Sequence, residues 1–233
     1  MDERAALRRR VDVKYAIGRK DFVALLDRLA EGYDALDISG DRRFGYRSVY
    51  FDTADLRCFL DHARAVKPRF KARTRHYVDS GQCVFEAKIK PRSGGTSKRQ
   101  ADHACEATDV VTPAAAELLS DALTEAGIPP PGRLEPVLET SFERITLVAR
   151  QGDARLTADL GVRLARMDGR GVCMRHDAVL VETKSRDGQG PADRELAGMG
   201  AETVALSKYR TGIDALLLRD DTGELAPVRR LFG

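Results

Sequence analysis

Charged side chains recur at every second position in several short segments of the chain. They are Asp12 and Lys14, then Lys71, Arg73 and Arg75, then Glu86, Lys88 and Lys90, then Arg155 and Asp159 with the polar Thr157 between them, and lastly Glu182 and Lys184. Successive side chains of a β-strand point to opposite faces, so each segment would place its charges on one face and mostly apolar side chains on the other. Guanidinium and ammonium groups on such a face would suit the oxygens of a phosphate chain. The spacing therefore predicts a surface that binds a polyanion.

The same alternation is typical of ordinary strands with one solvated face, and for any single segment the two interpretations stay open. The recurrence of the pattern and its richness in arginine favour the polyanion surface. A dry core is excluded, because burying about eight cations at several kcal/mol each would exceed the stability of a whole domain, about 5–15 kcal/mol. The charged faces must border water or hold a ligand of opposite charge.

Three carboxylates lie among these cations, at Glu86, Asp159 and Glu182. Carboxylates suit a phosphate site when they hold a cation, and Mg²⁺ or Mn²⁺ is commonly bound by one or two carboxylates together with phosphate oxygens and water. The alternative for each is an ion pair with a neighbouring Lys or Arg, and this alternative is weakest for Glu182. The three residues are therefore candidate metal ligands.

Other chemistries find little support. The chain has no GxxxxGK[ST], GxGxxG, GxSxG or HExxH motif. The cysteines show no zinc-site spacing, and we expect structural thiols in a reducing compartment. With 39 Lys and Arg against 36 Asp and Glu, the net charge of +3 does not by itself indicate nucleic-acid binding. The sequence contains no run of about 18 apolar residues, the length needed to span a membrane. We expect a cytoplasmic protein.

The charged segments are expected to be strands separated by short turns. Strands are predicted near residues 11–17, 46–53, 68–78, 82–90, 96–106, 136–150, 154–161, 162–168 and 178–184, and helices near 19–30, 56–60, 113–126, 191–199 and 207–218. Many short strands with a few peripheral helices are typical of an antiparallel barrel, and eight strands leave room for side chains and one extended ligand. We predict a single α+β domain over residues 1–233, an antiparallel eight-stranded β-barrel tunnel with the charged faces in its lumen.

Taken together, the motifs resemble a known family. In order, they are Lys14-Tyr15, YRSVYFDT, FKARTRHY, VFEAKIK, the SKR that contains Lys98, SFERITL, RLTADL, VETK and a late SKY. Each is weak alone. Their order and spacing across nearly the whole chain resemble the VTC domain, the catalytic domain of vacuolar transporter chaperone polyphosphate polymerases, within the CYTH or triphosphate tunnel metalloenzyme superfamily.

The resemblance implies roles for individual residues. The cations that would grip a triphosphate or polyphosphate are Lys14, Lys71, Arg73, Lys88, Lys98, Arg144, Arg155 and Lys208, with Lys184 as a further phosphate contact. Those that would also bind the nucleotide are Lys14, Arg73, Lys88, Arg144, Arg155 and Lys208. Glu182 matches the metal-binding carboxylate, and Glu86 would support it. The roles of Tyr50, Arg75, Lys90 and Arg99 depend on register, because a shift of one residue would turn each to the other face.

The activity that the resemblance implies is a metal-dependent polyphosphate polymerase. It would transfer the γ-phosphoryl group of a nucleoside triphosphate, expected to be ATP, to a growing polyphosphate chain, with Mn²⁺ or Mg²⁺. The alternatives are a triphosphatase in the same tunnel and a polyphosphate-binding module without catalysis. The first strand carries only Asp12 where the superfamily hydrolases have a fuller ExExK pattern, which weakens the triphosphatase alternative.

The expected ligands are nucleoside triphosphate and polyphosphate rather than nucleic acid. We expect no regulatory SPX module before the domain and no membrane segment after it. Translocation of a product would therefore need a membrane-protein partner that provides the channel. The motifs do not predict an oligomeric state.

Overall fold

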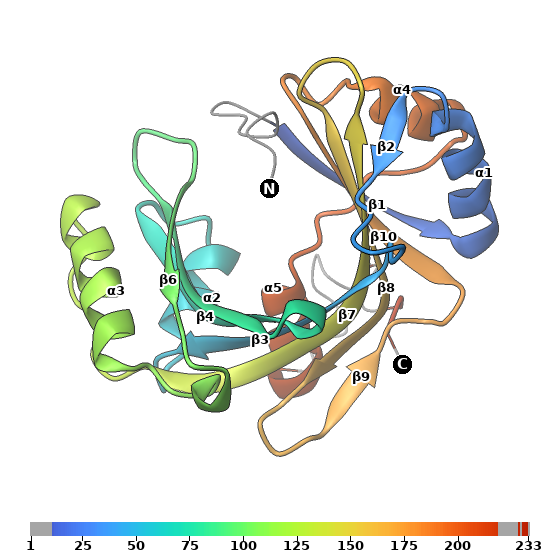
Figure 1. Cartoon of the computed structure of the whole chain (residues 1–233). Coiled ribbons are helices and arrows are strands. Elements are labelled where there is room, and N and C mark those ends of the chain that lie inside the picture. The colour runs from blue at the N-terminus through green and yellow to red at the C-terminus, as the bar shows by residue number, and fades with distance from the viewer. Residues whose placement is uncertain (1–10, 219–227, 229, 233) are drawn as a thin grey trace.

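The computed structural model describes residues 11–218, 228 and 230–232. Its strands form one curved antiparallel sheet, which Figure 1 shows as an arch. The strands of the arch are β1 (Val11–Gly18), β3 (Phe44–Asp52), β4 (Arg69–Tyr77), β5 (Gln82–Lys90), β6 (Ser97–Asp102), β7 (Glu135–Ala149), β8 (Arg155–Ala165) and β10 (Ala178–Ser185). They pair in the order β1-β10-β8-β7-β3-β4-β5-β6, while β2 (Tyr33–Ala35) pairs with β7 and β9 (Gly171–Cys173) pairs with β8.

The two end strands of the arch, β1 and β6, are not paired with each other in the described part of the chain. One edge of β1 pairs with β10, and its other edge is taken by a segment near the last helix. There Tyr15 bridges to Thr203, and the amide of Val204 donates to the carbonyl of Lys14 at 2.8 Å. Since a strand has two edges, β1 has none left for β6. The predicted antiparallel α+β fold is confirmed, and the predicted closed barrel is corrected to an open, tunnel-like sheet.

Helices cover the outer side of both arms of the arch (Figure 1). They are α1 (Arg19–Leu29) and α4 (Pro191–Gly198) on one arm and α3 (Pro113–Glu125) on the other. The remaining helices, α2 (Arg57–Ala63) and α5 (Lys208–Ile213), pack against each other, and η4 (Asp214–Leu218) continues α5. On one arm, Phe22 and Leu25 of α1 pack with Val179 and Val181 of β10. On the other arm, α3 packs against β5 and β6. Because the apolar residues of the strands face these helices, the alternate charged residues face the inside of the arch.

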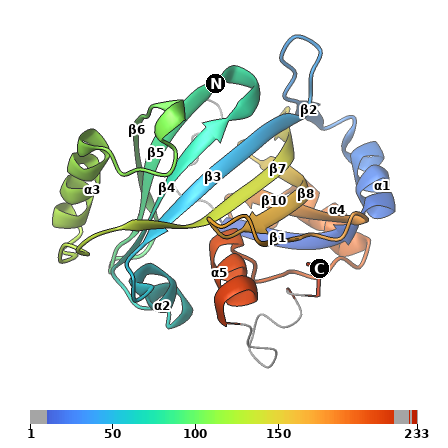
Figure 2. The same cartoon turned by 90° about the horizontal axis from the view of Figure 1, so that it is seen from below.

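Helix α5 packs against the inner side of the sheet at one end of the arch (Figure 2). Tyr209 stacks on Tyr50 of β3, with ring centroids 5.1 Å apart. Gly212 lies against Leu138 of β7, where an added Cβ would come within 2.5 Å of the leucine side chain, so any larger residue would have to displace Leu138. These contacts bring the start of α5 toward the charged rows of the sheet.

Asp52 at the end of β3 joins α5 to α2. Its carboxylate accepts the hydroxyl of Tyr209 and the amides of Cys58 and Phe59, the latter two at 2.8 and 3.0 Å. Thr53 Oγ1 also accepts the amide of Arg57 at 3.0 Å. Asp52 is fully buried, and its charge is satisfied by these donors at the start of the helix.

Four stretches differ from the sequence prediction. The two strands predicted over 154–161 and 162–168 are the single strand β8, Arg155–Ala165, because a bulge near Gly161, at φ +59°, lets the strand continue opposite β7. The strand predicted over 96–106 ends at Asp102, and η3 (Cys105–Ala107) follows. Strands β2 and β9 have three residues each, too few for an alternation signal.

Among the helices of the described residues, none is both long enough and apolar enough to cross a membrane.

Candidate functional site

Cations meet side by side on β4, β5 and β6. In the register of the sheet, Lys71 lies opposite Lys88, and Lys88 lies opposite Lys98. The neighbouring row places Arg73 opposite Glu86. Residues that alternate along a strand share a face, so all of these side chains belong to the inner face of the arch. We define the basic arm as Lys71, Arg73, Arg75, Glu86, Lys88, Lys90 and Lys98.

The other side of the arch carries cations and carboxylates in mixed rows. Lys14 of β1 lies opposite Glu182 of β10, and Asp12 lies opposite Lys184. Rows of the same kind continue onto β8 and β7. We define the paired arm as Asp12, Lys14, Arg144, Arg155, Asp159, Glu182 and Lys184, together with Lys208 of α5.

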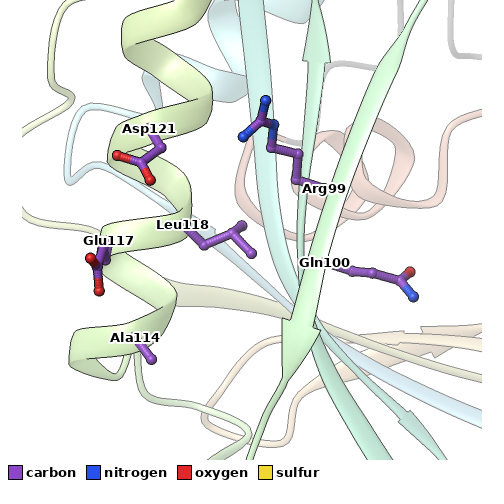
Figure 3. Close-up of a pocket in the computed structure, with 6 residues that line it drawn as sticks. All are labelled: Arg99, Gln100, Ala114, Glu117, Leu118 and Asp121. Atoms are coloured by element: carbon purple, nitrogen blue, oxygen red, sulfur yellow. The ribbon is translucent and has the colours of Figure 1, made fainter.

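Arg99 of β6 points away from the arch. It forms an ion pair with Glu125 of α3 and lines a pocket of about 440 Å³ between β6 and that helix. Figure 3 shows Arg99 and Gln100 directed to opposite sides of the strand. Of the residues whose role depended on register, Tyr50, Arg75 and Lys90 therefore share the inner face, and Arg99 does not.

Glu86 is held between two cations of the basic arm. Arg73 donates from Nε to Oε2 at 2.6 Å, and Lys98 Nζ lies 3.1 Å from Oε1. Burial alone would raise the pKa of this carboxyl, but Arg73, Arg75 and Lys98 outweigh burial and lower the pKa to about 2. Arg73 also donates to the hydroxyl of Tyr50 at 2.9 Å. Glu86 is therefore ionised at neutral pH, and both of its oxygens are engaged.

Lys71 and Lys88 have no carboxylate within ion-pair distance among the described residues. The ammonium group of Lys71 donates to Ser207 Oγ at 3.1 Å and lies 5.7 Å from the ring centroid of Tyr209. Burial, followed by repulsion from Lys88 and Lys14, holds the pKa of Lys71 well below its ordinary value. Lys14 belongs to the paired arm, so the two arms are close enough to act on each other electrostatically.

Asp159 joins two cations of the paired arm. Arg144 approaches it with two donors, Nε at 2.6 Å from Oδ1 and Nη2 at 2.9 Å from Oδ2, and Lys208 pairs with Oδ2. Asp159 is only 3% exposed. Burial would raise its pKa, but Lys208 and Arg144 lower it below the ordinary value. The ring of Phe142 lies 4.4 Å from the Lys208 ammonium and packs against the same cluster.

Lys184 is shared by two carboxylates of the paired arm. It pairs with Glu182, and its Nζ lies 3.2 Å from Asp12. Burial would raise the pKa of Glu182, but Lys184 and Lys14 hold it well below the ordinary value. Lys14 itself donates to the carbonyl of Leu206 at 2.7 Å. The segment before α5 thus contacts both arms, through Leu206 on one side and Ser207 on the other.

A family model of the VTC domain matches residues 9–217 of this sequence. The chain belongs to the VTC domain family. The match covers both arms and α5, and it confirms the resemblance carried by the sequence motifs. No curated protein sequence matches this chain.

A solved structure shares the fold of this VTC domain. A protein from Hippeastrum, described as a candidate adenylyl cyclase with a dominant triphosphatase activity, superposes with a TM-score of 0.50 at 16% identity, covering 89% of this chain and 97% of that one. A candidate adenylate cyclase from Vibrio parahaemolyticus gives a TM-score of 0.47 at 13% identity, with 85% and 94% covered. At such identity the Hippeastrum likeness concerns the fold, and it agrees with the tunnel-like sheet.

This VTC domain offers a partial ligand set for a divalent metal. Mg²⁺ is commonly held by one or two carboxylates together with phosphate oxygens and water. Glu182 fits such a site, together with Asp12, because both carboxylates pair with Lys184 and therefore lie close to each other. Glu86 does not fit, because both of its oxygens already accept from cations. In the described part of the chain no group of three or more His, Cys, Asp or Glu could hold an ion, so phosphate oxygens would have to complete the coordination.

The structure adds residues to which the sequence analysis assigned no role. Ser207, the N-cap residue of α5, accepts from Lys71, and no periodic pattern marks it. Tyr46 and Phe142 stack with centroids 5.3 Å apart, and the guanidinium of Arg144 lies 5.1 Å from each ring. Continuing the alternation of β3 back from Tyr50 would have placed Tyr46 on the inner face.

Proposed function

We propose that this VTC domain is a metal-dependent polyphosphate polymerase. It would bind a nucleoside triphosphate, expected to be ATP, and transfer its γ-phosphoryl group to a growing polyphosphate chain. The observation that carries the proposal is the placement of Lys71 and Lys88, two inner cations with no carboxylate within ion-pair distance among the described residues. A phosphate chain between the arms would supply that negative charge through charge-assisted hydrogen bonds.

In the proposed mechanism, the side chains position the reactants and neutralise developing charge. The cations assigned to phosphate are Lys14, Lys71, Arg73, Lys88, Lys98, Arg144, Arg155, Lys184 and Lys208. A terminal oxygen of the acceptor chain attacks the γ-phosphorus as its bond to the bridging oxygen breaks, and the nucleoside diphosphate leaves with that electron pair. No side chain has to act as the nucleophile. A Mg²⁺ or Mn²⁺ ion held by Glu182 would supply further positive charge at the phosphates.

Incubation of the purified protein with ATP and Mn²⁺ or Mg²⁺ tests the proposal. We expect long phosphate chains on gels and signals of internal phosphates in phosphorus NMR. Glu182→Ala should lose turnover and keep triphosphate binding, while Arg99→Ala, on the outer face, should keep both. Binding without turnover in every metal would instead identify a non-catalytic polyphosphate-binding module.

Hydrolysis of triphosphate on the same inner face is the second candidate. It is favoured by the description of the Hippeastrum protein, which names a dominant triphosphatase activity. Water would then attack the γ-phosphorus in place of the acceptor chain. Release of orthophosphate without chain growth, in the same incubation, would identify this reaction.

A single functional domain over residues 1–233, a cytoplasmic location and a membrane-protein partner for product export stay predictions. Limited proteolysis would test the first, and cell fractionation the second. Co-purification from membranes would test the third.

A further inference from the structure

Two cysteines meet on the outer side of the basic arm. Cys83 lies on β5, and Cys105 opens η3 after β6. The amide of His103 donates to the carbonyl of Cys83 at 2.9 Å, which continues the β5–β6 pairing to this point. Two residues later, the Cys105 thiol donates to the carbonyl of Gly81 at 3.0 Å and contacts the Cys83 thiol. The fold thus brings together two sulfur atoms whose residues lie 22 positions apart in the sequence.

The two thiols differ in exposure. Cys83 is 4% exposed, whereas Cys105 is exposed. Burial, together with the nearby Cys105, raises the pKa of Cys83 to about 11. Because Cys105 is the exposed thiol of the two, it is the one that an oxidant reaches first. The Cys83 sulfur is then positioned to attack the oxidised sulfur of Cys105.

We propose that Cys83 and Cys105 form a reversible disulfide when the protein meets a peroxide. The Cys105 thiolate attacks one oxygen of hydrogen peroxide, the O–O bond breaks, and a sulfenic acid and hydroxide form. The Cys83 sulfur, losing its proton, attacks the sulfenic sulfur, the S–O bond breaks, and water leaves. In sum, two thiols and one peroxide give one disulfide and two waters. A disulfide of this kind in a reducing compartment is typically transient and redox-sensing.

The crosslink would act on the wall behind the basic arm. The segment after Cys105 contacts β4, where Thr74 donates from Oγ1 to the carbonyl of Thr108 at 2.6 Å. Thr74 lies between Arg73 and Arg75, whose side chains point to the inner face. A Cys83–Cys105 bond would therefore tie the segment that leads to α3 to the back of the strands that carry these arginines. The inference does not depend on which reaction the inner face performs.

The test uses the full chain, reduced and then treated with stoichiometric hydrogen peroxide. After denaturation and alkylation, we expect two fewer alkylated thiols, a protein two hydrogen atoms lighter, and a proteolytic fragment that joins the Cys83 and Cys105 peptides. The thermal midpoint should rise by about 5 °C on oxidation and return when dithiothreitol is added.

Three variants sharpen the result. Cys105→Ser should leave Cys83 reduced after peroxide, and Cys83→Ser should leave a sulfenic acid at Cys105 that dimedone traps. Cys173→Ser removes the other exposed thiol and should leave the crosslink unchanged. The proposal is overturned if, in the unaltered protein, Cys83 remains alkylatable while Cys105 becomes sulfinic acid, or if the disulfide joins two molecules.

Discussion

The two arms of the arch carry similar residue types but differ in how many of their cations pair with a carboxylate. In the paired arm, Asp159 forms ion pairs with both Arg144 and Lys208, and Glu182 pairs with Lys184. In the basic arm, Glu86 forms ion pairs with Arg73 and Lys98. Lys71 contacts only a neutral hydroxyl oxygen and an aromatic ring among the described residues. Net charge over the whole chain is only +3, so it is local arrangement that creates a basic surface.

The difference indicates separate purposes for the two arms. A buried carboxylate between two cations holds side chains in fixed positions without any ligand. Cations that repel one another, as Lys71 and Lys88 do, weaken the empty protein and gain most when an anion arrives. The basic arm thus gives up stability for binding, a common feature of functional sites.

The largest expected effect is on the paired arm. Asp159→Asn leaves Arg144 and Lys208 without their carboxylate, and breaking a buried pair should lower the free energy of unfolding by about 3–5 kcal/mol. Denaturant unfolding measures this. The control is Glu195→Gln, which removes an exposed pair with Arg28, side chains 39% and 52% exposed, and should change stability by less than about 1 kcal/mol. Equal losses in the two variants would break the comparison.

The next effect depends on pH and concerns Glu86. Its pKa is lowered to about 2 from an ordinary 4.5, so its contribution to stability is complete above pH 4.5 and is lost as the pH falls toward 2. The stability difference between the unaltered protein and Glu86→Gln should shrink by about 3 kcal/mol between pH 6 and pH 2. Unfolding curves across this range measure it. Glu125→Gln, at an exposed pair, should show a much smaller change.

Removing an unmatched cation should separate binding from stability. Lys71→Met deletes one charged hydrogen bond to phosphate, about 1.5–3 kcal/mol, and should weaken triphosphate binding by about 10- to 100-fold. Because repulsion with Lys88 and Lys14 also disappears, the unfolding free energy should not fall. Calorimetric titration and thermal unfolding measure the two quantities. If stability drops while affinity holds, Lys71 is structural; Arg99→Met serves as the outer-face control.

The smallest effect is expected at the edge of the basic arm. Lys98 pairs with Glu86, but half of its side chain is exposed. Lys98→Met should therefore change stability by less than about 1 kcal/mol. It should also weaken triphosphate binding less than Lys71→Met does, because solvent screens its charge. The same titration and unfolding assays compare the two variants directly, and a larger binding loss for Lys98→Met would reverse the order.

Much of the inner face could be predicted from the sequence, because alternation depends only on local strand geometry. Lys71, Arg73 and Glu86 share a face in the sequence pattern and in the sheet alike. Arg99 could not be assigned in this way, since its face depends on how β6 aligns with β5. Its ion pair with Glu125 gives no local signal.

The features that the sequence could not predict depend on contacts between residues far apart in the chain or on local backbone geometry. The open sheet follows from Thr203 and Val204 taking the free edge of β1, a contact across nearly the whole chain. Ser207 meets Lys71 for the same reason. The bulge at Gly161 merged two predicted strands, because a glycine that reads as a turn in sequence can also carry a strand through a bend.

The late position of Ser207 and Lys208 has a consequence for how the protein is made. Translation delivers the strands of both arms before α5. A ribosome-bound chain that stops short of residue 207 would therefore carry most of the inner cations without Ser207, which accepts from Lys71, and without Lys208, which pairs with Asp159. Such a nascent chain would lack both contacts, and synthesis of α5 is the step that adds them to the two arms.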